Sequence, residues 1–137
     1  MAIDDANVEN GCLRFIKGSH KEKKLKSHNI NDNKNLTLNQ ELDESEYNEK
    51  DAVNLILKRG QISLHDVYLV HGSEANNSSM ARRAITMRFM PTSSVFDHQM
   101  VKDKNLFSKL NASKYQDRKI YHMRGKDISG KNNLTYI

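Results

Sequence analysis

The sequence has little of what staples or anchors many small proteins: one cysteine, one proline, no tryptophan and no long apolar run in 137 residues. The single cysteine, Cys12, excludes an internal disulfide and any zinc site that needs several cysteines. No stretch approaches the roughly 20 apolar residues that span a bilayer, and the N-terminus lacks the features of a secretory signal. We therefore expect a cytoplasmic protein without a membrane partner, and Cys12 as a small buried side chain.

Apolar residues are scarce overall. They make up 36% of the sequence, and the mean hydropathy is -0.80. Both values are low for a compact domain, although a chain of this length can bury roughly two thirds of the surface that its unfolded form exposes. We expect that long polar loops dilute a single modest core and that part of the domain is absent.

The net charge of +5 and the pI of about 9.3 raise the question of nucleic-acid binding. The densest basic run, Lys21 to Lys26, is interrupted by Glu22 and has no aromatic residues interleaved for base stacking. A solvated loop explains this run better, and we expect no nucleic-acid partner. A basic nucleic-acid-binding module is the alternative, and it would bind DNA or RNA with a steep salt dependence.

Short apolar runs separated by polar turns predict strands in the first two thirds of the chain. Ala2-Ile3 is read as the end of one strand and Cys12 to Ile16 as another, which Gly18-Ser19 stops. From about residue 20 to residue 50 the chain is polar, with Leu36, Leu38 and Leu42 as its few apolar anchors. This segment is expected to be a surface insert.

Further predictions cover the chain from residue 52 onward. Strands are expected at 52–57, at one or two places within 62–71, ending at His71, and at 84–90, which Pro91 closes. The small polar residues 72–79 predict a turn, residues 95–110 contain a candidate short helix, and residues 115–137 read as a peripheral tail.

This pattern favours an all-β fold with minor helix, either an antiparallel barrel or a jelly roll. The predicted organisation is a domain part over residues 1–92, with the polar insert at about 20–50, followed by a C-terminal extension over residues 93–137.

His71 has the neighbourhood of a metal ligand, although single histidines such as His20 and His65 are common near strand ends. Gly72, Ser73 and a polar turn follow His71, and Arg82 comes eleven positions later (82 − 71), at the head of the next predicted strand. A neutral imidazole at a strand end suits iron(II) and leaves other coordination positions open. A nearby guanidinium suits the far carboxylate of a chelating dicarboxylate cosubstrate.

Two blocks carry a specific resemblance. Residues 60–92, GQISLHDVYLVHGSEANNSSMARRAITMRFMPT, and residues 4–21, DDANVENGCLRFIKGSHK, resemble the closing segment and the earlier ENGCL and PGSH segment of the phytanoyl-CoA dioxygenase family. Both occur in the family's order with a variable insert between them. With residues 53–59, the resemblance covers most of residues 1–92.

The resemblance implies a double-stranded β-helix, also called a jelly roll or cupin-like fold. It also implies an iron(II)- and 2-oxoglutarate-dependent dioxygenase that uses O₂ to hydroxylate a small-molecule substrate. By position, His71 matches the distal histidine of the two-histidine, one-carboxylate triad. Arg82 matches the arginine that binds the far carboxylate of 2-oxoglutarate, and Ser73 is a candidate second group on that carboxylate. His65 is a candidate pocket residue.

The remaining matched positions are expected to shape the backbone. Asn76 and Ser78 are predicted to form the turn that returns Arg82 beside His71, and turn and strand geometry is the expected role of four residues in the other block: Asn10, Gly11, Ser19 and His20. Lys17 departs from the proline of the PGSH pattern, which affects the local loop.

The family's first histidine and carboxylate form an HxD motif upstream of the ENGCL block, and this sequence has no such motif there. His65-Asp66 is a poor substitute, because successive strand residues point to opposite faces. We therefore expect a domain that is incomplete at its N-terminus, an isolated chain that is inactive, and a missing N-terminal half as a partner. An inactive fragment or a degenerate scaffold or binding module of the same fold is the alternative. A halogenase variant also stays open.

Overall fold

The computed structural model describes residues 1–31, 33, 40–98 and 117–137, which form two compact units, Met1–Met87 and Arg88–Ile137. The regular structure consists of short strands and three-residue or four-residue 3-10 helices. This confirms the all-β prediction with minor helix. Among the described residues, no helix has the length and apolar character needed to cross a bilayer.

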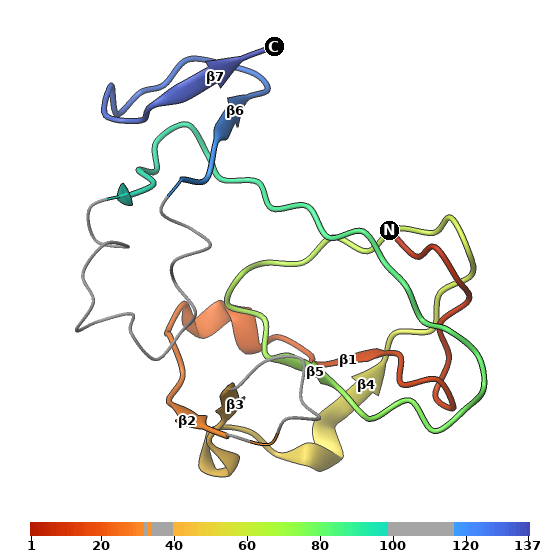
Figure 1. Cartoon of the computed structure of the whole chain (residues 1–137). Coiled ribbons are helices and arrows are strands. Elements are labelled where there is room, and N and C mark those ends of the chain that lie inside the picture. Colours follow the sequence, from red (N-terminus) through yellow and green to blue (C-terminus); the bar gives the residue numbers. More distant parts are fainter. Residues whose placement is uncertain (32, 34–39, 99–116) are drawn as a thin grey trace. The chain divides into compact units, whose positions relative to one another are not determined.

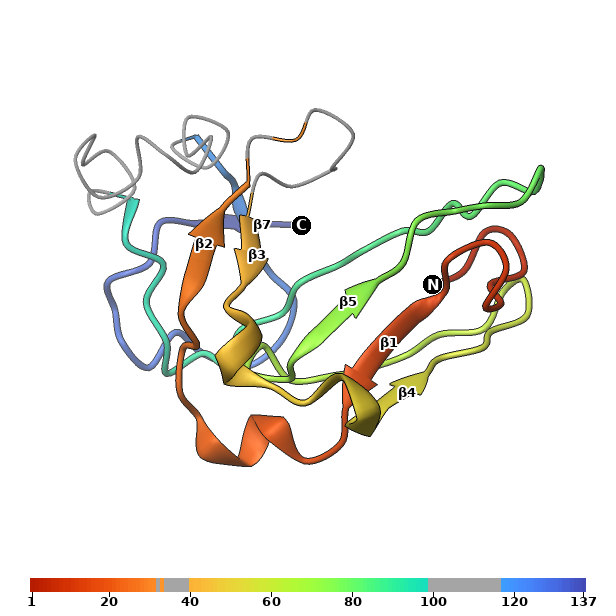
Figure 2. The same cartoon turned by 90° about the horizontal axis from the view of Figure 1, so that it is seen from below.

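A three-stranded antiparallel sheet organises the first unit (Figures 1 and 2). Its order is β4 (Ala52–Asn54), β1 (Leu13–Ile16), β5 (His71–Ser73). The predicted strands at 12–16 and 52–57 are confirmed, the second in shortened form. Because both neighbours of β1 come from distant parts of the chain, this sheet brings the two sequence blocks together.

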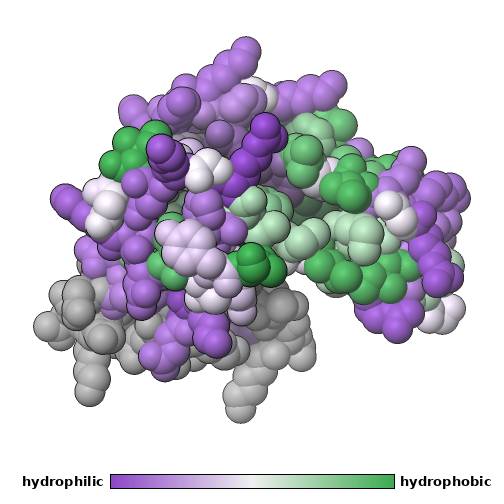
Figure 3. All heavy atoms as spheres, turned by 90° about the horizontal axis from the view of Figure 1, so that it is seen from above, coloured by the Kyte–Doolittle hydropathy of each residue, from purple (hydrophilic) through white to green (hydrophobic). Residues whose placement is uncertain are grey.

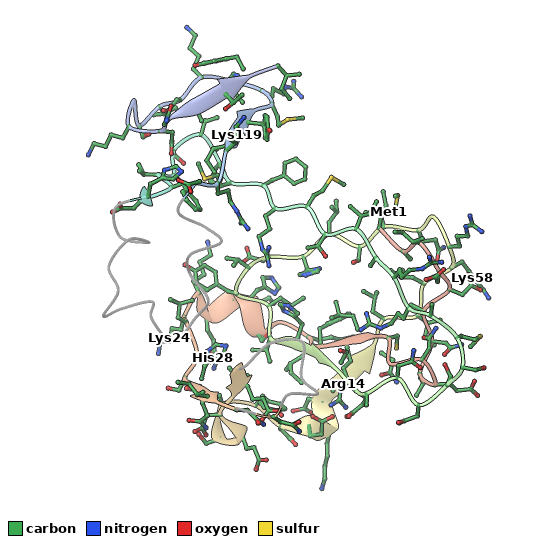
Figure 4. All side chains as sticks on the ribbon, in the orientation of Figure 1. Met1, Arg14, Lys24, His28, Lys58 and Lys119 are labelled. Carbon is green, nitrogen blue, oxygen red and sulfur yellow. The ribbon has the colours of Figure 1, made fainter. Side chains whose placement is uncertain are left out.

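The register assigns the side chains of this sheet to two faces. Phe15 lies opposite both Val53 and His71, and Leu13 lies opposite Ser73. Directly opposed residues share a face, as do residues two apart on one strand. His71 and Ser73 therefore lie on the apolar face of β1, whereas Arg14 lies on the other face, where it pairs with Glu49 and Glu74 (Figure 4).

The N-terminal segment runs beside two later parts of the chain. Isolated antiparallel bridges join Ala2 to Ala84 and Ala6 to Leu57. The Ala2 amide also donates to the Gln61 carbonyl at 2.9 Å. These two alanines are buried together with Cys12, as predicted for that cysteine. The core around them is therefore built from small side chains.

A tight turn leads into β1. Asn7 and Asn10 exchange reciprocal hydrogen bonds between side-chain oxygen and backbone amide, at 2.8 and 3.0 Å, and the Asn10 amide group donates to the Asp5 carbonyl at 2.8 Å. Gly11 follows with φ of +70°, and a Cβ there would lie 2.5 Å from the Glu74 carbonyl oxygen. The geometric role predicted for Asn10 and Gly11 is therefore confirmed.

The polar insert contains more regular structure than the sequence predicts. It holds five elements: η1 (Ser19–Glu22), β2 (His28–Ile30), β3 (Gln40–Leu42), η2 (Glu44–Glu46) and η3 (Glu49–Asp51). β2 and β3 pair antiparallel, with His28 opposite Leu42. The segment is mostly exposed, as expected of a surface insert. The anchors Leu36 and Leu38 lie outside the described residues.

Two strand predictions were wrong. No strand forms over 62–70, and β5 begins at His71 instead of ending there, inside what was predicted as a turn. The segment 84–90 forms only the bridge at Ala84. Leu64 is 90% exposed and Phe89 is 73% exposed, so these alternating apolar residues have no described strand beside them to pair with. Apolar side chains at the surface are visible in Figure 3.

The second unit contains a parallel pair, β6 (Ile120–His122) and β7 (Leu134–Tyr136). Asn132 holds the connection between them, since its side chain donates to the Ser94 carbonyl at 2.9 Å and to Asp127 at 3.0 Å. The predicted C-terminal tail therefore contains paired strands. The helix predicted within 95–110 falls mainly on residues 99–110, outside the described part of the chain.

Candidate metal and cosubstrate site

His71 opens β5 with its ring oriented by the backbone. Its Nδ1 lies 2.7 Å from the Leu69 carbonyl oxygen. A carbonyl can only accept a hydrogen bond, so Nδ1 carries the proton in the neutral ring and Nε2 keeps its lone pair. Carbonyl-anchored imidazoles of this kind are well suited to bind metals, because the anchor fixes both the tautomer and the ring direction. The side chain is exposed, and Nε2 is therefore open to a metal ion.

Ser19 holds the backbone immediately before His71. Its hydroxyl donates to the Ile16 carbonyl at 2.9 Å and accepts from the Val70 amide at 2.8 Å. The Ile16 amide in turn donates to the Val70 carbonyl at 3.0 Å. The geometric role predicted for Ser19 is thus confirmed. Ser19, in the GSH sequence of residues 18–20, positions the start of β5. His20 lies in η1 and makes no such contact with the backbone before His71.

Ser73 follows two residues after His71 on the same strand and therefore on the same face. Its side chain is exposed, and its hydroxyl makes no hydrogen bond within the described residues. This arrangement leaves the hydroxyl available to a ligand beside His71. The role predicted for Ser73 on a carboxylate stays a prediction.

Two neighbouring arginines near the N-terminal segment have different environments. Arg83 forms a two-pronged pair with Asp4, with Nε and one terminal nitrogen donating to separate carboxylate oxygens at 2.9 and 2.8 Å. Arg82 is half-buried and has no ion pair or hydrogen bond of its side chain among the described residues, and none joins it to His71. Sequence reasoning gave Arg83 and Asp4 no role, and nothing in their spacing indicates the pair. The Arg83 guanidinium is therefore occupied by Asp4, whereas the Arg82 guanidinium is available to a ligand.

The Asp4–Arg83 pair gives a pH prediction. The Arg83 guanidinium and the Arg83 backbone amide lower the pKa of Asp4 from 3.8 to about 2. The folded-state pKa lies below the unfolded value, so the stability from this pair is present above pH 3.8 and is lost as the pH falls through about 2. In the Arg83→Gln variant, the Asp4 pKa should move back toward its ordinary value, as measured by NMR titration of the carboxyl carbon.

Asp5 provides the control for this titration. Its pKa is lowered by the Arg59 backbone amide and by the Lys58 ammonium group, not by Arg83. It should therefore stay low in Arg83→Gln. If the Asp4 pKa did not change in that variant, Arg83 would not be its cause.

The polar turn between β5 and Arg82 is built by Asn76. Its side-chain oxygen accepts from the Ser78 amide at 2.9 Å, and its amide group donates to the Met80 carbonyl at 2.7 Å. Asn76 and Ser78 therefore shape this turn, as predicted. The turn ends two residues before Arg82.

His65 lies beside His71 because of a second turn. The Asp66 carboxylate accepts from the Tyr68 amide at 2.9 Å, and the Asp66 carbonyl accepts from the Leu69 amide at 3.1 Å. This reversal brings the His65 and His71 ring centroids to 5.2 Å, with the planes tilted by 56°. Burial, and next the proximity of His71, lower the pKa of His65 below 6.5. The predicted pocket role of His65 stays a prediction.

An open pocket of about 250 Å³ adjoins the residue before His71. Its lining includes Val70, Ile16, Ser19, Tyr47 and Lys26. Lys26 is paired with Glu22 at 2.7 Å and with Glu46 at 3.5 Å. Because the pocket's acidic and basic groups neutralise each other, its charge does not select a class of substrate.

The residues fit only part of an iron site. Within 1–31, 33, 40–98 and 117–137, no three His, Cys, Asp or Glu side chains come together in a group that could hold a metal ion. His71 has the tautomer of a ligand and Arg82 is open to an anion, but a single imidazole holds iron(II) poorly against water. The ligand set is therefore incomplete in the part of the chain described.

Comparisons with known proteins agree with the two blocks. The model of the family described as phytanoyl-CoA dioxygenase (PhyH) matches residues 1–84. A Dictyostelium discoideum protein named phytanoyl-CoA dioxygenase domain-containing protein 1 homolog is 36% identical over 91 residues, which are 65% of this chain and 32% of that protein. The homolog of the same name from Caenorhabditis elegans is 34% identical over 99 residues, 66% of this chain and 33% of that protein.

An Arabidopsis thaliana protein named phytanoyl-CoA dioxygenase is 33% identical over 87 residues, which are 64% of this chain and 30% of that protein. The chain thus spans about a third of the length of these curated relatives. No solved structure matches it.

Proposed function

Because the chain belongs to the phytanoyl-CoA dioxygenase family, we propose that it forms part of an iron(II)- and 2-oxoglutarate-dependent dioxygenase that hydroxylates a small-molecule substrate. The observation that carries the proposal is the state of two side chains. His71 presents an unprotonated Nε2, fixed by the Leu69 carbonyl, and Arg82 remains open while Arg83 is committed to Asp4.

The proposed fold is a double-stranded β-helix of which β4, β1 and β5 form part of one sheet. Its support is the antiparallel pairing of strands that are distant in sequence. Segments 62–70 and 84–90 keep an alternating apolar pattern but expose it, as strands awaiting neighbours would. We propose that the remaining strands and the other two iron ligands come from a part of the domain outside these residues.

Each residue has a proposed task. His71 would donate Nε2 to iron(II), Arg82 would bind the far carboxylate of 2-oxoglutarate, and Ser73 would add a hydroxyl to that carboxylate. Iron(II), when bound, supplies the chemistry that couples O₂ and 2-oxoglutarate to hydroxylation. The contribution of this chain is therefore orientation of one ligand and capture of the cosubstrate.

A non-catalytic scaffold of the same fold is the second candidate. It is favoured by the lack of a three-ligand group in the described part of the chain. The two candidates differ in whether any form of the protein binds iron(II) and 2-oxoglutarate together.

An anaerobic titration separates them. Iron(II) and 2-oxoglutarate are added to the 137-residue chain and to an extended form, which includes the reading frame upstream of Met1 as far as it stays open. The weak visible charge-transfer absorption of the chelate is followed. We expect the absorption in the extended form and none in the shorter chain. If neither form shows it, the scaffold candidate replaces the dioxygenase.

Arg82 gives a more specific prediction. Arg82→Ala in the extended form should weaken 2-oxoglutarate binding roughly 10- to 100-fold, because a charge-assisted hydrogen-bonded pair contributes about 1.5–3 kcal/mol. Arg82→Lys should be intermediate, since it keeps the charge but loses the planar fork. The measurement is the 2-oxoglutarate concentration that gives half of the absorption change.

Arg83→Ala is the matched control, because it removes the same side chain one position away. Its 2-oxoglutarate affinity should stay close to that of the unchanged protein. Equal losses in the Arg82 and Arg83 variants would contradict the assignment of Arg82.

A further inference from the structure

The proposed iron site uses the imidazole of His71 but not that of His65, which lies beside it. Their ring centroids lie 5.2 Å apart, and both side chains are exposed. His65 is six positions from His71 in sequence (71 − 65), and the Asp66 turn, not a strand, brings it there. A hydrogen-bonded turn on one side and a carbonyl anchor on the other define where the two rings lie.

The spacing suits joint binding of one metal ion. Two imidazoles on a tetrahedral ion, at the usual zinc–nitrogen distance of about 2.0–2.1 Å, have ring centres about 5 Å apart. A tilt of 56° keeps the rings from stacking flat on each other.

The nitrogens needed for binding are available. His71 keeps Nε2 free because Nδ1 donates to Leu69. The His65 ring makes no hydrogen bond among the described residues, so neither of its nitrogens is committed. In the part of the chain that the structure describes, no Asp or Glu side chain joins the two imidazoles in a group of three, and the Asp66 side chain accepts from the Tyr68 amide. The donor set is therefore purely imidazole.

We propose that His65 and His71 together bind a borderline divalent transition metal, for which Zn²⁺ is the representative, with water filling the other positions. Imidazole donors favour Zn²⁺, Ni²⁺ and Cu²⁺ over iron(II) in the usual order of affinities. The site would exist in the 137-residue chain without 2-oxoglutarate. It shares His71 with the proposed function but does not depend on it, and zinc there would exclude iron from Nε2.

The test is calorimetric titration of the 137-residue chain with Zn²⁺. Holding two donors close raises affinity well above that of either alone, by about 100-fold or more. His65→Ala and His71→Ala should therefore each weaken Zn²⁺ binding about 100-fold, and the double variant should lose binding at this site. His65→Phe keeps a ring against His71 but removes the nitrogens, so it should lose affinity as His65→Ala does.

His28 is the matched control, labelled in Figure 4. It is exposed, and its Nδ1 lies 2.7 Å from the carbonyl oxygen of the residue two before it, as in His71, but its ring has no aromatic neighbour among the described residues. His28→Ala should leave the affinity unchanged. Circular dichroism spectra of the variants should match that of the unchanged chain.

Two results would contradict joint metal binding by His65 and His71. One is unchanged zinc affinity in His65→Phe or His65→Ala, which would make His65 a packing neighbour only. The other is an equal loss in His28→Ala, which would mean that any anchored imidazole suffices. Arg82→Ala separates this inference from the proposed function, because it should weaken 2-oxoglutarate capture and leave zinc binding intact.

Discussion

Replacing Asn10 with alanine should lower the free energy of unfolding by roughly 1–3 kcal/mol, because a buried side chain is lost and two part-buried backbone groups lose their hydrogen-bond partners. Asn10 is 0% exposed, and its side chain serves the Asn7 amide and the Asp5 carbonyl. Alanine can serve neither group and leaves space where the amide was. Since domains of this size are stable by only about 5–15 kcal/mol, the loss would be a large share of the total.

Urea unfolding followed by circular dichroism measures this effect. The matched control is Asn54→Ala, which makes the same change at an exposed position of β4. It should alter stability by no more than about 0.5 kcal/mol. If both variants lost the same amount, burial of Asn10 and its hydrogen bonds would not be the reason.

The importance of Asn10 extends to the candidate site. The turn that it closes delivers the chain into β1, and β1 is the strand to which β5 and His71 are paired. Loss of this turn should therefore disturb His71 from a distance. The ENGCL block thus acts through geometry, which is the role that sequence reasoning gave it.

The strands that could be predicted are those that have pairing partners among the described residues. The run of Leu13 to Ile16 became β1 because β4 and β5 lie on its two sides. The equally regular pattern of 84–90 formed one bridge only. Alternation of apolar and polar residues indicates which side chains would share a face of a strand. A strand also needs a neighbouring strand to complete its backbone hydrogen bonds. Periodicity in one sequence cannot supply that neighbour.

The candidate site was predictable in part for a similar reason. His71 and Arg82 were named from the spacing of a motif, which is a local property of the sequence. The Asp4–Arg83 pair joins residues 79 apart, which come together because the N-terminal segment pairs with residues 83–85, including the bridge of Ala2 to Ala84. The nearness of His65 to His71 was also missed, because alternation assumed a strand where the Asp66 turn reverses the chain.

His71→Ala in the extended form should abolish the absorption of the iron(II)–2-oxoglutarate complex. Removal of one of the three proposed protein ligands leaves a site that competes poorly with water, because the ring that the Leu69 carbonyl orients is lost. His28→Ala, which removes an anchored imidazole from β2, should leave the absorption unchanged. The measurement is the same anaerobic titration.

Rescue distinguishes a ligand from a residue that merely supports the fold. In His71→Gly, free imidazole added to the solution should restore part of the absorption, because it can occupy the vacated position and donate a nitrogen to iron(II). A folding defect would not respond to imidazole. Full absorption in His71→Ala, or a loss that imidazole cannot relieve in a variant with an unchanged circular dichroism spectrum, would remove His71 from the coordination sphere. The family's chemistry would then need another ligand.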